Sequence, residues 1–423
     1  MKSIILPALL VLLLPACATL PPPTVAPAWS NVGAATNRLQ SLADLRPLAD
    51  QFPESAAVQL RLLTAAHKSG DKEVVRAQLR RLDLMGYAVS NASFEQVAVH
   101  LTDSEVAELR ARFEGYGRPV EASSNLSFVP IEGRLIEGVV RDAPTGRLFA
   151  SSVVGRELWM FDKQWAPVPG IDSGSLTGLA VDETRRLLWM ASGAVRQTPL
   201  PGTAFRGLIA MSLKENKIVR RIEVPSPEMF PGDILAAPDG TIYASDSGTG
   251  AIMVGRPGVT RLSVLLPAGH LRSPQGLVLS RNGKHLYVAD YDNGIAIVDL
   301  ASGHVSRLAA AKPMMLNGID GLYAYGGGLI AIQNGTSPRR IVALQLDRAG
   351  TGISNLHVIE QNHHSWGEPT NGYVDQRAKA LIYVSDAQWE RFDKGGTVRG
   401  SERLRPTLIR KVKLGKPVSR QRS

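Results

Sequence analysis

The chain has 423 residues, of which 44% are hydrophobic and 20% are charged, and its formal net charge is +10. This composition is typical of a globular protein and excludes a wholly disordered, collagen-like or polytopic membrane protein. The single cysteine excludes an intramolecular disulfide framework and any zinc site built from several cysteines.

The first residues have the pattern of an export signal. Lys2 precedes an apolar run, residues 4–14, that is too short to span a membrane comfortably. The run ends in Leu14-Pro15-Ala16-Cys17, which resembles a bacterial lipobox, and the only cysteine stands where lipidation needs a thiol. We therefore predict a signal peptide over residues 1–16 and a lipid anchor in the membrane at Cys17. A plain secretory signal is the alternative.

The residue after Cys17 bears on location. Ala18, rather than Asp, resembles the pattern of Gram-negative lipoproteins that are sorted to the outer membrane. We expect a protein of the cell envelope that is held on the outer membrane and faces the periplasm. Residues 17–37 are polar and rich in proline, which predicts a tether.

A basic tail ends the chain at residues 416–423, within a cluster of Arg and Lys that begins at Arg403. Such a tail can bind nucleic acid or an anionic membrane. Because no nucleic-acid motif accompanies the charge, we predict no nucleic-acid partner and interpret the tail as a solvated segment.

Residues 38–118 have helical periodicity and predict a small helical module. One helix carries an apolar stripe that includes Val58 and Leu62 and stops at Gly70, and Asp71 is a good N-cap for the next. A third helix starts at Thr102, with a capping box. The first two resemble one tetratricopeptide-like hairpin. A solenoid needs about three repeats, so we predict a packing or docking module, with peptide binding as the alternative.

From residue 122 to residue 415 the pattern has period two and repeats six times. The second strand of each copy contains one large apolar residue, and these anchors are 40, 54, 44, 42 and 54 residues apart: Phe149, Trp189, Tyr243, Tyr287, Leu329 and Tyr383. A period of about 40–50 residues with several strands per copy indicates propeller blades. We predict a mainly β protein, a six-bladed β-propeller preceded by the helical module.

In a propeller the innermost strands line a central channel, and equivalent residues at their starts face one another across the axis. Here these residues are Glu137, Thr177, Asp233, Gln275, Asp320 and Asn371. Oxygen ligands of this kind suit hard divalent cations such as Ca²⁺ and Mg²⁺. The alternative is that they cap the channel and bind water.

Three segments resemble the regucalcin–gluconolactonase family of lactonase-like six-bladed propellers. They are Ile136-Glu137-Gly138, the stretch from Ser273 to Asp290, and Ile319-Asp320-Gly321. The resemblance implies a divalent metal (Ca, Zn or Mg) held by Glu137, Gln275 and Asp320, with Gln275 at the position of a family Asn. It implies further that Asp320 accepts a proton during hydrolysis of a lactone or ester.

The sequence departs from the family on the substrate side. Gly232 replaces a further family Asn, and the Arg usually near it is absent from residues 228–233. Three functions therefore stay open: a metal-dependent lactone or ester hydrolase, a non-catalytic propeller that binds a small molecule or an envelope protein, and an envelope-assembly factor.

One loop before the sixth blade holds additional candidates. His363 and His364 can bind a metal or move protons, but adjacent side chains point apart in an extended chain, so a surface loop is the simpler interpretation. We keep His364 as a candidate for the channel or substrate. Trp366, Trp389 and Phe392 form either an apolar rim or part of the core.

Overall fold

The structure is a computed structural model, and the described residues are 26–33, 35–200, 202, 204–400 and 403–415. The signal peptide, Cys17, the start of the tether and the basic tail lie outside the described residues, so these expectations stay predictions. Within the described part, no helix has the length and apolar character needed to cross a lipid bilayer.

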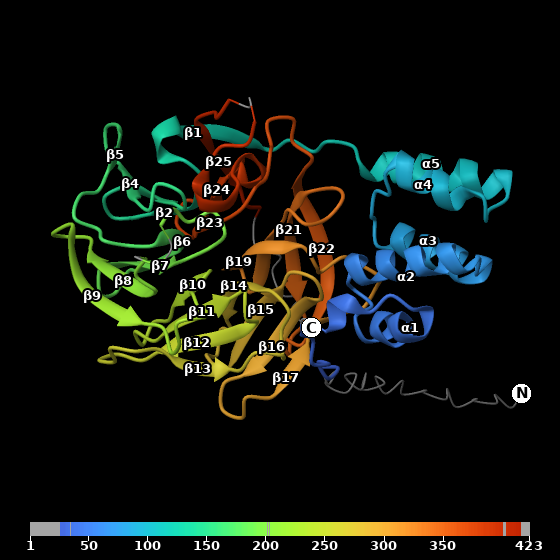
Figure 1. Cartoon of the computed structure of the whole chain (residues 1–423), viewed down its shortest axis with the longest axis horizontal. Helices are drawn as coiled ribbons and strands as arrows, with labels where there is room; N and C mark the ends of the chain where they lie inside the picture. The colour runs from blue at the N-terminus through green and yellow to red at the C-terminus, as the bar shows by residue number, and fades with distance from the viewer. Residues whose placement is uncertain (1–25, 34, 201, 203, 401–402, 416–423) are drawn as a thin grey trace, which may run out of the picture.

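Six sheets form the β part of the chain, one per blade (Figure 1). The first three blades contain β2 (Ile136–Arg141), β3 (Leu148–Ser152), β4 (Leu158–Phe161) and β5 (Trp165–Pro167); β6 (Ser175–Asp182), β7 (Leu187–Gly193), β8 (Gly207–Ser212) and β9 (Lys217–Glu223); and β10 (Ile234–Ala236), β11 (Ile242–Asp246), β12 (Ala251–Gly255) and β13 (Ser263–Leu266).

The other three blades differ slightly in composition. They contain β14 (Pro274–Leu279), β15 (His285–Asp290), β16 (Gly294–Asp299) and β17 (Val305–Arg307); β19 (Ile319–Tyr325), β20 (Gly328–Gln333), β21 (Arg340–Leu346), β22 (Gly352–Gln361) and the short β18 (Ala309–Ala310); and β23 (Gly372–Asp375), β24 (Ala380–Val384), β25 (Thr407–Lys413) and β1 (Ser123–Val129). Strands pair antiparallel except β18, which runs parallel to β22.

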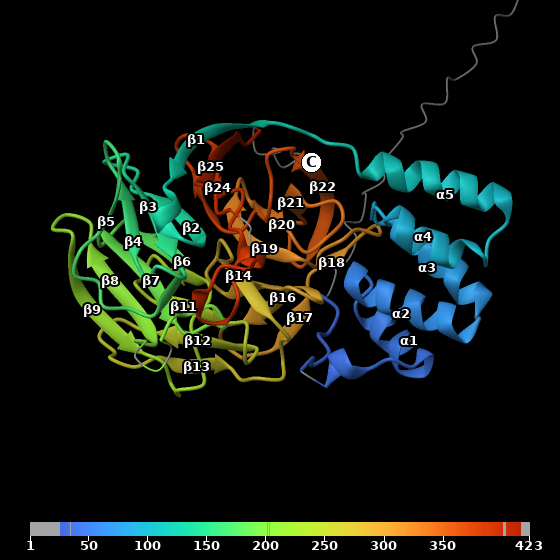
Figure 2. The same ribbon diagram turned by 45° about the horizontal axis from the view of Figure 1, so that its top comes forward.

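The ring closes through the first strand of the propeller. β1 is the outermost strand of the sixth blade and pairs with β25, with Ser123 opposite Val412. The inner strands β2, β6, β10, β14, β19 and β23 contact one another in that order, and β23 contacts β2. Figure 2 shows the blades around their common axis. The predicted six-bladed propeller is confirmed, and each predicted anchor lies in the second strand of its blade.

Bulges interrupt the pairing of the inner strand with the second strand in four blades. The register shifts lie between Ile136 and Gly138, Leu176 and Leu179, Pro274 and Leu277, and Ile319 and Leu322. A bulge leaves a residue unpaired and changes the direction of its side chain. The bulged segments contain Glu137, Thr177, Gln275 and Asp320, so the bulges set the direction of four candidate side chains.

A glycine follows each of these four residues, and at Gly138, Gly178 and Gly276 it allows neighbouring inner strands to lie close together. A Cβ atom on Gly276 would lie 2.5 Å from the backbone nitrogen of Leu322, and one on Gly178 would lie 2.6 Å from the carbonyl oxygen of Gly232. Both contacts are to backbone atoms of the next blade, which cannot rotate away.

Gly276→Ala should therefore lower the free energy of unfolding by about 1–3 kcal/mol through overpacking. Chemical denaturation measures the loss. The control is Gly115→Ala in α5 (Asp103–Tyr116), where a Cβ meets no atom within 4 Å and alanine should stabilise the helix by about 0.5–1 kcal/mol. Equal stability of the two variants would contradict the close approach of the inner strands.

The helical module contains α1 (Leu42–Gln51), α2 (Ala56–Ser69), α3 (Lys72–Leu84), α4 (Asn91–Ala98) and α5. The predicted pair is α2 and α3, joined at Gly70 in a left-handed conformation and capped by Asp71. The capping box of Thr102 and Glu105 is present at α5. α1 and α4 are additional helices. Short 3₁₀ helices lie at Thr36–Arg38, Ile131–Gly133, Trp389–Arg391 and Lys394–Gly396.

The module packs beside the fourth and fifth blades, which Figure 1 shows on one side of the propeller. The turn between α1 and α2 makes the contact: Ser55 Oγ donates to the carbonyl of Asp292 at 2.5 Å, and Ala56 N–H donates to Asn317 Oδ1 at 2.9 Å. Leu45, Leu48 and Phe52 share one apolar cluster with residues of the third and fourth blades. The module and the propeller therefore have a joint core.

Part of the expected tether also packs on the propeller. Trp29 is 7% exposed and Val32 is 1% exposed, and Trp29 Nε1 donates to the carbonyl of His270 at 2.8 Å. Ala28 forms a β-bridge with Ser306. Residues 26–33, which lie within the predicted tether 17–37, are thus held against the fourth blade, because Trp29 and Val32 bury apolar surface there.

Candidate functional site

The six equivalent positions lie in the inner strands of their blades or directly before them. The strands on either side hold them through backbone bonds: Asn371 N–H donates to the carbonyl of Glu137 at 3.2 Å, and Gly178 N–H donates to the carbonyl of Gly232 at 2.8 Å. These bonds join the sixth blade to the first and the second blade to the third. Two pairs of neighbouring blades are thus joined at this end of the inner strands, which we call the channel mouth.

One hydrogen bond crosses the channel between opposite blades. Asn371 Nδ2 in the sixth blade donates to Asp233 Oδ1 in the third at 2.8 Å. Tyr323 OH of the fifth blade donates to Asn371 Oδ1 at 3.2 Å and accepts from Gly372 N–H at 2.6 Å. Asp233 Oδ2 is buried and has no hydrogen-bond partner among the described residues. The channel thus contains one buried carboxylate oxygen that is free to meet a ligand.

Glu137 and Asp320 each have one direct partner at the same mouth. Trp389 Nε1, from the long loop between β24 and β25, donates to Glu137 Oε2 at 2.5 Å. Asn334 Nδ2 donates to Asp320 Oδ2 at 2.8 Å, and Tyr291 OH donates to Asn334 Oδ1 at 2.8 Å. Glu137 is 7% exposed and Asp320 is 8% exposed. Both carboxylates are buried and oriented by neutral donors.

The pKa values of these acids are raised. Burial raises the pKa of Glu137 well above its usual range, and the negative charges of Asp320, Asp233 and Glu368 raise it further. Burial and the charges of Asp233 and Glu368 raise the pKa of Asp320 in the same way. Burial raises the pKa of Asp233 to about 7. Burial is thus the largest cause for all three acids, and the charges of neighbouring carboxylates add to it at Glu137 and Asp320.

Glu368 is a member of this group that the sequence analysis missed. It lies in the loop between β22 and β23, outside the repeat, and its backbone carbonyl accepts from Ala387 N–H at 3.0 Å. Burial raises the pKa of Glu368, with the charge of Glu390 adding to the effect. Its position three residues before Asn371 was the available signal in the sequence.

The other predicted channel residues have local partners. Thr177 Oγ1 donates to the carbonyl of Gly232 at 2.8 Å. Gln275 Nε2 donates to Ser273 Oγ at 3.3 Å. Thr177 therefore joins two blades, whereas the amide of Gln275 makes one weak bond within its own blade.

The donor chemistry of the mouth fits a hard divalent cation. Buried carboxylates without a positive neighbour are unfavourable, and the charged neighbours that act on Glu137 and Asp320 are other carboxylates. Among the described residues, no three of the mouth carboxylates bring their oxygen atoms within 4.8 Å of one another. A cation there would accordingly have at most two of these carboxylates as direct ligands, and neutral oxygen atoms would complete the set. Oxygen ligands favour Ca²⁺ or Mg²⁺ over Zn²⁺.

Behind the Asp233–Asn371 bond, the channel contains a partly open cavity of about 290 Å³. The inner strands of all six blades line it, and apolar residues such as Leu179, Leu277 and Leu322 dominate the wall. Asp233 and Asn371 stand at the end of the cavity nearest the mouth. The cavity has room for a small ligand or a short chain of water molecules.

His364 has partners outside the channel mouth. Its Nδ1 lies 2.6 Å from Oε1 of Glu121, in the linker between α5 and β1, and its side chain is 72% exposed. Trp366 Nε1 donates to Tyr383 OH at 2.9 Å, and Phe392 is buried in a cluster with Leu135. Of the three aromatic residues proposed for the rim, Trp389 contacts a channel carboxylate. The structure thus brings Glu137, Asp233, Asp320 and Asn371 to one mouth and pairs His364 with the linker.

No protein-family model matches the chain, and no curated protein matches its sequence. Solved structures to which it is similar include calcium-binding regucalcin from Agrobacterium tumefaciens, at 15% identity over 68% of this chain and 94% of that chain, with a TM-score of 0.44. A gluconolactonase from Xanthomonas campestris has 16% identity over 71% of this chain and 98% of that chain, with a TM-score of 0.44. A PQQ-bound aldose sugar dehydrogenase from Streptomyces coelicolor has 15% identity over 70% and 98%, with a TM-score of 0.43.

The chain is a six-bladed β-propeller protein, and this class rests on its own six sheets. The solved structures include gluconolactonase-like and regucalcin-like propellers, the group that the sequence resembles. Sequence identities of 15–16% show a shared fold alone, and one fold can carry many functions.

Proposed function

We propose that the channel mouth is a hydrolytic site for a small lactone or ester, and that it works with a divalent cation, Ca²⁺ by preference. The observation that supports this most directly is the meeting of Glu137, Asp233, Asp320 and Glu368 at one buried place, where each acid has a raised pKa. Acidic side chains that lie together in one cleft and have perturbed pKa values are typical of functional sites.

In this proposal Glu137 and Asp320 hold the cation, and Gln275 adds an amide oxygen. A bound divalent cation polarises a carbonyl group and makes a water molecule more acidic. The indole of Trp389 and the amide of Asn334 keep the two carboxylates oriented. Asp320 was expected to accept the proton as well, but its Oδ2 already accepts from Asn334.

Asp233 is better suited to receive a proton. Its Oδ2 has no hydrogen-bond partner among the described residues, and its pKa of about 7 lies close to neutral, where a general base works best. Asn371 fixes the carboxylate through Oδ1 and leaves Oδ2 free for the proton. We therefore assign proton transfer to Asp233.

Calcium titration together with thermal melting tests the site. Ca²⁺ should raise the melting temperature of the wild type and EDTA should remove the increase, while Glu137→Gln and Asp320→Asn should abolish the response. Turnover of a panel of δ-lactones and aryl esters should fall about 100-fold or more in the same variants. Glu132→Gln, an exposed carboxylate five residues before Glu137, is the matched control and should behave like the wild type. A wild type that ignores both Ca²⁺ and EDTA and has no turnover would refute the hydrolase.

A second candidate function is binding without catalysis, and the channel cavity favours it. About 290 Å³ of mostly apolar space ends at the free oxygen of Asp233, which suits a small apolar molecule with one hydrogen-bond donor. Ligand binding that persists in EDTA and in Glu137→Gln, but weakens in Asp233→Ala, would favour this function over hydrolysis.

We also propose that the protein works at the cell envelope, anchored by a lipid on Cys17. The support is the lipobox-like Leu14-Pro15-Ala16-Cys17 behind a short apolar run. Metabolic labelling with a palmitate analogue should mark the wild type, and Cys17→Ser should remove the label and release the protein from the membrane fraction. Equal labelling of both would contradict lipidation at this cysteine.

A further inference from the structure

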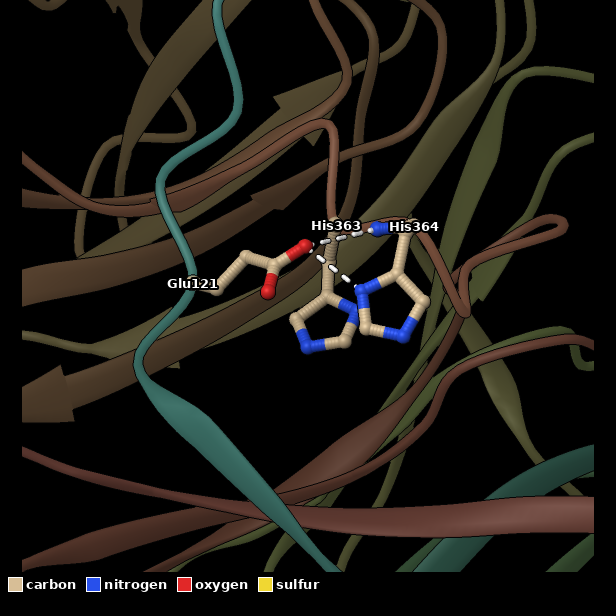
Figure 3. Close-up of side chains that lie close together, drawn as sticks. All are labelled: Glu121, His363 and His364. Atoms are coloured by element: carbon tan, nitrogen blue, oxygen red, sulfur yellow. Dashed lines mark hydrogen bonds and ion pairs between the residues drawn. The ribbon is translucent and has the colours of Figure 1, made fainter.

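Three side chains that can ligate a metal meet where the helical module joins the propeller (Figure 3). Glu121 belongs to the linker between α5 and β1, and His363 and His364 follow β22. Their ligand atoms all lie within 4.8 Å of one another, and in the described part of the chain this is the only such set of three or more His, Cys, Asp or Glu residues. We call it the linker cluster.

The backbone explains why two adjacent histidines can serve one site. Trp366 N–H donates to the carbonyl of His363 at 2.9 Å, so residues 363–366 form a turn. In a turn, neighbouring side chains do not alternate as they do in a strand. The two imidazole rings stack with centroids 4.5 Å apart and an angle of 26° between their planes. Figure 3 shows Glu121 directed at the same side of the pair.

Glu121 is already fixed for a role as ligand. Its Oε1 lies 2.6 Å from Nδ1 of His364 and accepts the backbone N–H of His364 at 3.2 Å. The side chains of His364 and Glu121 are 72% and 41% exposed, which leaves an open side for water. Two imidazole nitrogens, one carboxylate oxygen and one water molecule form the usual ligand set of a four-coordinate Zn²⁺ ion.

The contacts of His363 define what metal binding would require of this residue. Its Nδ1 accepts from Ser365 N–H at 3.0 Å, which requires the proton to be on Nε2. Oε1 of Glu360 lies 3.8 Å from Nε2, and a carboxylate beyond the outer nitrogen is a frequent partner of a metal-bound imidazole. A guanidinium can only donate, so Arg410 Nη2, which lies 2.8 Å from Nε2, has to turn to the carbonyl of Ser123, to which it already donates at 2.9 Å, before Nε2 can carry the proton.

We propose that the linker cluster is a Zn²⁺ site formed by Glu121 Oε1 and the Nδ1 atoms of His363 and His364. When the metal binds, Nδ1 of His363 gives up the hydrogen bond from Ser365 N–H. Nδ1 of His364 gives up its hydrogen bond to Glu121 and loses its proton to the solvent. This site is separate from the channel mouth, whose carboxylate and amide oxygens suit a harder cation.

The ion would fasten the linker to the loop that leads into the sixth blade. The two are already joined by the bridge between Val120 and Gln361 and by Asn362 Nδ2, which donates to the carbonyl of Gly117 at 2.8 Å. The same loop continues to Glu368 and Asn371 of the channel mouth. Zn²⁺ would therefore stabilise the join between the module and the propeller and restrict the loop that carries two mouth residues.

Zn²⁺ titration of the purified chain by calorimetry tests the site, with the melting temperature as a second readout. The wild type should bind one Zn²⁺ ion and melt at a higher temperature with it. His364→Ala and Glu121→Gln change exposed side chains, so they should fold normally and bind Zn²⁺ at least about tenfold more weakly. Either variant binding Zn²⁺ as the wild type does would overturn the proposal.

Two controls locate the ion. His67 Nδ1 and His100 Nε2 lie 3.0 Å apart in the helical module, so this pair is the alternative site for Zn²⁺. His100→Ala and the channel variant Glu137→Gln should both keep the binding of the wild type. Loss of binding in His100→Ala would place the ion in the helical module, and loss in Glu137→Gln would place it in the channel. Each of these results would refute the linker cluster.

Discussion

Asp233→Asn should raise the free energy of unfolding of the metal-free protein by about 2–4 kcal/mol at pH 8, which follows from the difference between the folded and ordinary pKa values. The pKa of Asp233 is about 7 in the folded chain, against an ordinary value of 3.8. Asparagine has the same shape and keeps an oxygen for the bond from Asn371. Its NH₂ group replaces the unpartnered Oδ2. The variant therefore removes a buried charge and keeps the contact across the channel.

The pH dependence follows from the sign of this shift. Below about pH 4, Asp233 is protonated in both the folded and the unfolded chain, so it contributes no difference. Between pH 4 and pH 7 the unfolded chain releases the proton and the folded chain retains it, so the wild type loses stability as the pH rises. Above about pH 7 Asp233 is ionised in both states, and the wild type loses no further stability through this residue. The advantage of the Asn variant should thus grow between pH 4 and pH 7 and then stay constant.

Urea denaturation in EDTA at several pH values measures the effect. Asp162→Asn changes an exposed aspartate on the first blade and should have little effect at any pH. A pH-independent difference between wild type and Asp233→Asn would show that the carboxylate of Asp233 is not held in an unfavourable place.

Glu360→Ala should lower the free energy of unfolding by about 3–5 kcal/mol, since it leaves buried donors without a partner. Glu360 is fully buried in β22 of the fifth blade. Its Oε1 accepts from Ser123 N–H at 3.0 Å and from Ser123 Oγ at 2.6 Å, and its Oε2 accepts from Tyr383 OH at 2.7 Å. One side chain therefore connects the fifth blade to β1 and β24 of the sixth.

Thermal melting and limited proteolysis measure the consequence. Because β1 closes the ring, loss of Glu360 should expose the linker and β1 to protease before the rest of the propeller unfolds. Glu360→Gln keeps an acceptor oxygen for Ser123 and should lose less stability than the alanine variant. Glu215→Ala removes an exposed carboxylate and should have almost no effect. A similar small effect at Glu360 would contradict its role in closing the ring.

The repeat was predictable from the sequence because the second strand of each blade is buried between its neighbours. Phe149, Trp189 and Tyr383 are at most 2% exposed, so each blade needs one large apolar residue at this position. The closing strand was not predictable in this way. Its partner Val412 lies almost 300 residues from Ser123, and a local pattern does not encode such a pairing. α1 contains Pro47 and α4 has 8 residues, which weakened their helical pattern.

The candidate site was partly predictable from the sequence because most of its residues belong to the repeat. Glu137, Asp233, Asp320 and Asn371 are equivalent positions of the repeat, and symmetry brings them to one mouth. Glu368 was missed because it belongs to a loop, and loops have no place in the repeat. The bulges that direct the side chains depend on pairing between strands, which the residue types do not reveal. The direction of His364 depends on Glu121, more than 240 residues away.

The packed segment at residues 26–33 limits how far the propeller can lie from the membrane. With a lipid on Cys17, 8 residues at most separate the anchor from the first residue that lies on the fourth blade. Even a fully extended chain of that length spans only about 30 Å. The edge of the fourth blade would thus stay within about 30 Å of the lipid headgroups, which is roughly the diameter of a small domain. A connection this short favours substrates and partners that lie at the membrane surface. Molecules that diffuse freely through the periplasm would meet the protein less often.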